Sequence, residues 1–200
     1  MDLDPKDLID RAAEARKEAS AARLNAAVAV TVAVLATFMG ICKVKDDNIV
    51  QAMQQAQADK LDNWAYFQSR TVRADVAEST ATQLLLAKAA APAAQAADYD
   101  KAIASYRDKA AEQLKKRDEL KAQAEAAQKT YDSLNYRDDQ FDLSDALLAI
   151  AIALLAVTAL TKLWPLFFVS LVPTFFGVLM GVSGLAALPI HPDALIKLLS

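Results

Sequence analysis

The chain has 200 residues, of which 54% are hydrophobic and 24% are charged, and its net charge is −3. Lysine and arginine alternate with acidic residues and form no basic stripe, which excludes a nucleic-acid-binding surface. The single cysteine, Cys42, excludes an intrachain disulfide.

The hydrophobic residues are concentrated in two stretches. Residues 24–42 contain no charge, and the 45 residues 146–190 contain one, Lys162. A helix of 45 residues would be roughly 68 Å long, more than two bilayer thicknesses, so this stretch must fold back on itself. Lys162-Leu163-Trp164-Pro165 combines a charge, an interfacial aromatic and a helix breaker. The sequence therefore predicts transmembrane helices at 24–43, 143–162 and 166–188.

Residues 1–23 predict an amphipathic helix ahead of the first span. Asp4 is a suitable N-cap, and Pro5 suits the first helical position. The apolar face is thin and contains mostly alanine: Leu8, Ile9, Ala12, Ala15, Ala19 and Ala22. Because the polar face mixes acids and bases, we expect this helix to pack against other helices rather than lie on lipid.

The polar segment 44–142 contains no glycine and one proline, Pro92, near its middle. This composition predicts two long helices of equal length that fold back at Pro92. At the base of this hairpin we expect two ion pairs, Lys45 with Asp139 and Asp47 with Arg137.

The second arm has a heptad pattern typical of a coiled coil. Its predicted contact positions are Tyr99, Ile103, Tyr106, Ala110, Gln113, Arg117, Leu120, Ala124, Ala127, Tyr131 and Leu134. The first arm is less regular, with candidates Val50, Met53, Leu61, Trp64, Ala65, Phe67, Val72, Val76, Ala81 and Leu85. The predicted fold is thus an all-α membrane protein with three transmembrane helices and a long antiparallel coiled-coil hairpin between the first two.

Residue types that carry chemistry are sparse. There is no Gly-rich phosphate loop, no serine nucleophile motif and no paired cysteine, and the single histidine is His191. The acidic run 137–145 can be a divalent-cation site, because carboxylates suit such ions, or a helix entry with Ser144 as its cap. We favour the helix entry and expect no catalytic residue, cofactor or metal.

Small and aromatic residues mark a candidate interface between copies of the chain. Small residues four apart let helices approach closely in lipid, and adjacent aromatic residues cannot all face one partner helix. The candidates are Ala36, Gly40, Gly177, Gly181, Gly184, Trp64, Tyr66 and Phe67. The alternative is a monomer whose spans use these glycines for internal packing.

Two segments resemble a known family. They are Asp62-Asn63-Trp64-Ala65-Tyr66-Phe67-Gln68-Ser69-Arg70, which follows a span ending in 38–45, and Tyr131-Asp132-Ser133-Leu134-Asn135-Tyr136, which precedes the paired spans. They are similar to a family of bacterial membrane proteins known as domain of unknown function 4337. The resemblance implies a bacterial inner membrane and no activity.

The expected function is that of a non-enzymatic, homo-oligomeric scaffold embedded in the lipid bilayer. The alternative is a channel or transport subunit with a pore between copies, lined by hydroxyl residues: Thr31, Thr37, Thr158, Thr161, Ser170, Thr174 and Ser183. Positive charge in residues 1–23 and at Lys162, against only Lys197 in the tail 189–200, predicts a cytoplasmic N-terminus. The hairpin and tail are then periplasmic.

Overall fold

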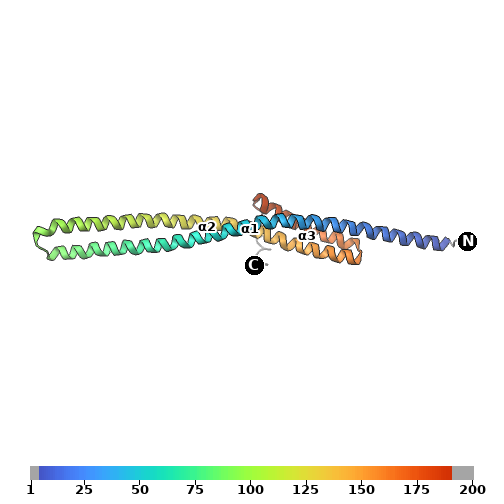
Figure 1. The fold of residues 1–200 in the computed structure, drawn as a ribbon, viewed down its shortest axis with the longest axis horizontal. Coiled ribbons are helices and arrows are strands. Elements are labelled where there is room, and N and C mark those ends of the chain that lie inside the picture. Colours follow the sequence, from blue (N-terminus) through green and yellow to red (C-terminus); the bar gives the residue numbers. More distant parts are fainter. Residues whose placement is uncertain (1–4, 191–200) are drawn as a thin grey trace. The chain divides into compact units, whose positions relative to one another are not determined.

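The computed structural model describes residues 5–190, and these residues contain three α-helices and no strand. The helices are α1 (Pro5–Ala90), α2 (Ala96–Thr161) and α3 (Trp164–Ala186), with a short 3-10 helix, η1 (Ala93–Gln95), between the first two (Figure 1). Three sequence predictions, the Asp4 cap, His191 and the charge of Lys197, lie outside the described residues.

Helix α1 is continuous over 86 residues, so the predicted N-terminal helix, first span and first arm form a single element. It ends two residues before Pro92, which has the extended backbone expected at that residue type (φ −60°, ψ 143°). The predicted break at 162–165 is also present. Lys162 has φ 55°, and α3 starts at Trp164 with Pro165 in its first turn.

Each of the three helices contains a stretch long and apolar enough to cross a membrane. Large apolar side chains on these stretches point away from the protein. Among them, Val30 is 65% exposed, Leu160 83% and Phe175 64%. Such side chains are unfavourable in water and suit lipid, so both length and surface fit a membrane protein.

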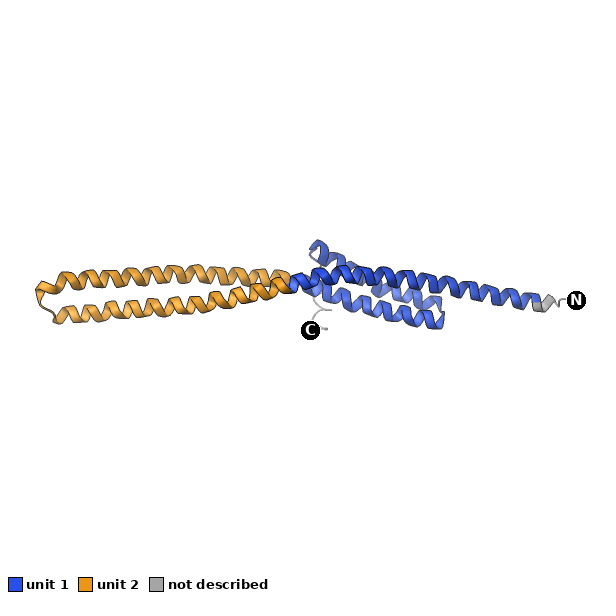
Figure 2. Cartoon of the chain, in the orientation of Figure 1, with its two compact units in different colours: residues 1–50, 135–200 blue, residues 51–134 orange. Residues whose placement is uncertain are grey.

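The chain divides into two compact units (Figure 2). Unit 1 comprises residues 1–50 and 135–200 and contains the three apolar stretches. Its core joins Leu24, Val28 and Leu35 of α1 to Leu148, Ala151 and Leu155 of α2, with Phe167 and Val178 of α3 packed against them. Within this unit, the N-terminal part of α1 extends past the turn between α2 and α3 (Figure 2).

Unit 2, residues 51–134, consists of the end of α1 and the start of α2, which lie side by side and are joined through η1 (Figure 2). We call residues 51–90 the first arm and 96–134 the second arm. All eleven heptad positions predicted for the second arm are buried or half-buried. The heptad pattern therefore identified the inward face of this arm correctly.

The predicted contact face of the first arm was partly wrong. Leu61, Val72 and Val76 are 57%, 60% and 60% exposed. The side chains that turn inward instead repeat at steps of four and three, and several are polar: Met53, Ala56, Lys60, Asn63, Phe67, Arg70, Ala74, Ala77, Ala81, Leu84 and Lys88.

The polar side chains on this inward face are satisfied by partners from the second arm. The Lys60 ammonium donates to Gln128 Oε1 at 2.7 Å, and Arg70 Nη1 donates to Gln113 Oε1 at 2.8 Å. Lys88 forms an ion pair with Asp100 next to the turn. These bonds offset the cost of placing polar groups on a contact face.

Candidate functional site

The glycines of α3 form a contact surface inside the chain. Gly177, Gly181 and Gly184 are all buried. A Cβ atom at Gly177 would lie 2.8 Å from the side chain of Leu148, and one at Gly184 would lie 2.8 Å from the ring of Phe141. These distances are too short for any side chain. The expectation that these three glycines meet a second copy is therefore corrected, because α1 and α2 already cover them.

Gly181 lies where α3 meets both α1 and α2. A Cβ atom there would be 2.7 Å from the ring of Phe38 and 2.8 Å from Ser144 Oγ. The Ser144 hydroxyl donates to the carbonyl of Gly177 at 2.8 Å. Ser144 lies within α2 and is not a helix cap, so that expectation was wrong. The helix passes through the acidic run without a break.

The last turn of α3 is held by polar side chains of α2. Arg137 donates through Nε and Nη2 to the carbonyl of Gly184 at 3.2 and 2.8 Å. Gln140 Nε2 donates to the carbonyls of Leu188 and Ile190 at 2.9 and 2.6 Å. Arg137 thus satisfies a carbonyl group that the C-terminus of α3 leaves without an intrahelical partner and complements its negative end, whereas Gln140 holds residues that follow the helix.

The expected ion pairs at 45–47 and 137–139 differ from the contacts that the structure describes. Asp47 pairs with Lys43 at 3.4 Å, and Arg137 binds the Gly184 carbonyl. The Asp47–Arg137 pair is therefore replaced, because each residue has a nearer partner. Asp139 accepts a hydrogen bond from Asn135, and its predicted pair with Lys45 stays a prediction.

Three carboxylates of unit 1, Asp46, Asp138 and Asp142, lie near the end of the first apolar stretch. Asp46 is 4% exposed, and its Oδ2 accepts a hydrogen bond from Lys43 Nζ at 2.8 Å. Burial, followed by a hydrogen bond with Asp46 and the charge of Asp142, raises the pKa of Asp138 to about 6. Burial and the charge of Asp46 also raise the pKa of Asp142. Among the described residues, no group of three or more possible ligands is placed to hold a metal ion.

The hydroxyl groups expected to line a pore all bond within their own helices. Each donates to a backbone carbonyl three or four residues earlier, as Thr31 does to Ala27 at 2.8 Å and Ser183 to Leu179 at 2.7 Å. The other five are Thr37, Thr158, Thr161, Ser170 and Thr174. Each hydroxyl proton is thus already engaged in a hydrogen bond to the backbone. In addition, Thr158, Ser170 and Ser183 are fully buried.

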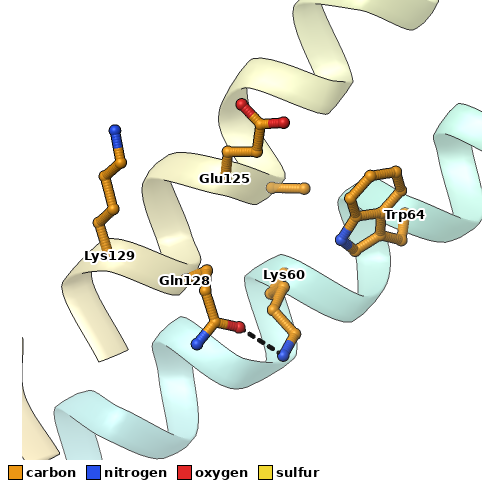
Figure 3. Close-up of a pocket in the computed structure, with 6 residues that line it drawn as sticks. Lys60, Trp64, Glu125, Gln128 and Lys129 are labelled. Atoms are coloured by element: carbon orange, nitrogen blue, oxygen red, sulfur yellow. Dashed lines mark hydrogen bonds between the residues drawn. The ribbon is translucent and has the colours of Figure 1, made fainter. Parts of the chain in front are cut away.

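Unit 2 has a shallow pocket of about 380 Å³ between its arms (Figure 3). The pocket is lined by Lys60 and Trp64 of the first arm and by Ala124, Glu125, Gln128 and Lys129 of the second arm. Lys60 and Gln128 point toward one another, whereas the Lys129 side chain points away from the first arm (Figure 3). The indole of Trp64 stacks edge-on against the ring of Phe67, with centroids 5.2 Å apart. Trp64 and Phe67 are half-buried, whereas Tyr66 is 61% exposed. Of the three aromatic interface candidates, Tyr66 is thus the one available to a second molecule.

A family model described as domain of unknown function (DUF4337) matches residues 24–187. The chain belongs to this family. No curated protein and no solved structure matches it. The DUF4337 match covers the three apolar stretches, both arms and the carboxylates around Asp46, so the family resemblance extends from the Trp64 segment to residues 24–187.

Sequence reasoning missed Asp46, the most buried carboxylate among the residues of this DUF4337 chain that the structure describes. A signal was present. Cys42, Asp46, Ile49 and Met53 follow one another at steps of four and three, which is the spacing of a buried helix face, and Asp46 is the charged member of that series. A charge in an otherwise apolar periodic series marks a buried ionisable group that needs a partner.

Proposed function

We propose that this protein is a non-enzymatic, homo-oligomeric scaffold of the bacterial inner membrane, with unit 2 as a coiled-coil hairpin outside the bilayer. The observation that carries the proposal is an exposed stripe of small residues along α1. We call it the α1 stripe. Its members repeat at alternating steps of four and three and are all exposed: Ala12, Ala15, Ala19, Ala22, Ala26, Ala29, Ala33, Ala36 and Gly40.

The α1 stripe lies opposite the side of α1 that the chain itself uses. Leu24, Val28 and Leu35 pack against α2 and occupy the other face of the helix. A helix that met only lipid would gain nothing from alanine and glycine over larger apolar residues. Small residues do allow two helix backbones to approach closely, which is how helices associate in lipid.

The α1 stripe is continuous through two different environments. Residues 26–40 belong to the apolar stretch, whereas residues 12–22 belong to the polar N-terminal part of α1. A partner must therefore have an apolar helix that continues without a break into a polar one. A second α1, running parallel in the same membrane, meets this requirement along the full length of the stripe.

The α1 stripe is tested by introducing larger side chains at positions where the fold of the chain leaves room for them. Ala36→Leu with Gly40→Leu is suitable, because a Cβ at Gly40 meets no atom within 4 Å. We expect the wild type to have the mass of an oligomer in mild detergent and in native nanodiscs, and the double variant to shift to a lower mass. The control is Val30→Leu with Val34→Leu, which enlarges two exposed positions outside the α1 stripe.

Two outcomes contradict the scaffold. If the wild type has the mass of a monomer, the protein is not a homo-oligomer. If the double variant has the same mass as the wild type, the α1 stripe is not part of the interface. The channel alternative makes a different prediction, namely ion conductance by the wild type in liposomes. The positions of Thr158, Ser170 and Ser183 argue against it, because these three residues are fully buried within one chain, whereas a pore between copies needs polar groups on the surface where the copies meet.

Topology is tested by thiol labelling in intact cells. We propose a cytoplasmic N-terminus and a periplasmic hairpin, from the charges that flank the spans. In a Cys42→Ala background, Gln95→Cys should react with a membrane-impermeant maleimide and Ala13→Cys should not. Ala13 is preferable to Ser20, whose hydroxyl accepts a hydrogen bond from Trp164. Labelling of Ala13→Cys alone would reverse the orientation.

A further inference from the structure

Asp46 is a buried carboxylate with one unsatisfied oxygen. Its Oδ2 is held by Lys43, but its Oδ1 is inaccessible to solvent and has no hydrogen-bond donor among the described residues. Buried polar atoms nearly always have a partner, because an unmade hydrogen bond is costly away from water. The site thus lacks one proton donor next to Asp46.

The group nearest to supplying that donor is another carboxyl. Asp138, on α2, lies within hydrogen-bonding reach of Asp46. When both are ionised, neither carries a proton, so two negative groups meet with nothing between them. When one is protonated, its O–H donates to the other, which is a short and strong kind of hydrogen bond.

The charges around this pair favour taking up a proton. From α1 the ionisable neighbours are Cys42, Lys43 and Asp47, and from α2 they are Asp139, Asp142 and Asp145. Helix α3 has no ionisable side chain. The cation Lys43 faces this group of carboxylates, and it is already engaged by Asp46 and Asp47.

We propose that Asp46 and Asp138 form a proton-dependent pair, in which Asp138 binds a proton and donates it in a hydrogen bond to Asp46, and that this bond strengthens the contact between α1 and α2. A proton fits better than a metal ion, because the described residues place no set of three ligands around a common point. Both carboxylates belong to one chain, so this proposal does not depend on the proposed oligomer.

The pair makes the stability of unit 1 dependent on pH. The pKa of Asp138 is raised from its usual 3.8 to about 6 in the folded chain. Between these two values the folded chain binds more protons than the unfolded chain, so stability rises as the pH falls through that window and is lost as the pH rises. Above it the two carboxylates repel each other.

The test compares the full-length wild type with Asp138→Asn in detergent between pH 5 and pH 8. The expected result is a melting temperature that increases as the wild type is acidified, with a much smaller increase for Asp138→Asn, whose amide supplies a donor at every pH. Asp47→Asn is the control, because it removes an exposed carboxylate beside Lys43 and should keep the wild-type increase. An equal increase in Asp138→Asn would overturn the proposal.

A second measurement observes the proton itself. Infrared difference spectra between pH 5 and pH 8 should contain a protonated-carboxyl C=O band with a midpoint near pH 6, absent in Asp138→Asn and in Asp46→Asn. A band that survives in Asp138→Asn would overturn the assignment, even if Asp46→Asn fails to fold. Adding Mg²⁺ or Ca²⁺ at pH 7 should leave the wild-type melting temperature unchanged. Stabilisation by either ion that Asp138→Asn abolishes would replace the proton with a metal.

Discussion

Replacing Gly177 with leucine should separate α3 from α2 and lower the stability of unit 1 by about 2–4 kcal/mol. A Cβ at this position would lie 2.8 Å from the buried side chain of Leu148 and 3.2 Å from its backbone nitrogen. Neither helix can avoid this collision by a change of rotamer, because backbone is involved. The hydrogen bond from Ser144 to the Gly177 carbonyl would be lengthened or lost as well.

The measurement is thermal or denaturant unfolding of the full chain in detergent. Val34→Leu is the control, since it introduces the same side chain into an apolar helix at an exposed position outside the α1 stripe. It should leave stability close to that of the wild type. The opposite pattern, a normal stability with reduced mass for Gly177→Leu, would place the glycine between copies of the chain and contradict the packing described here.

Replacing Ile103 with aspartate should unfold the two arms near their turn. Ile103 is 5% exposed on the inward face of the second arm. Loss of the buried side chain alone costs about 2–5 kcal/mol. A carboxylate at such a site has to be neutralised or brought to water, which opens the contact between the arms.

Hydrogen exchange followed by mass spectrometry locates this effect within the full chain. Amide protection should fall over residues 81–110 and remain unchanged in the three apolar stretches. Ala104→Asp is the control, because it adds the same charge at the neighbouring exposed position. Equal loss of protection in both variants would mean that the second arm does not use the face that contains Ile103.

Several features could be predicted from sequence because their causes are local. Proline cannot continue a helix, so Pro92 marked the turn between the arms. Lys162 and Pro165 marked the turn between α2 and α3 for similar reasons. The heptad pattern of the second arm identified its inward face, since Ile103, Ala110 and Ala124 are buried as expected. Each of these signals lies within a few residues of the structure that it specifies.

Other features depended on which helices meet. The spacing of Gly177 and Gly181 predicts close approach of a helix, but it does not say whether that helix belongs to the same chain. The structure assigns the contact to Leu148, Phe38 and Ser144.

The inward face of the first arm could not be predicted from the sequence, because it too depends on which residues the partner helix supplies. It includes Lys60, Arg70 and Lys88, which read as solvent-facing until their partners are known. Asp46 is a similar case, because its environment is formed by Asp138, 92 positions further along the chain. Polar groups become tolerable inside a protein only when a distant residue satisfies them, and that residue is identified once the helices are packed together.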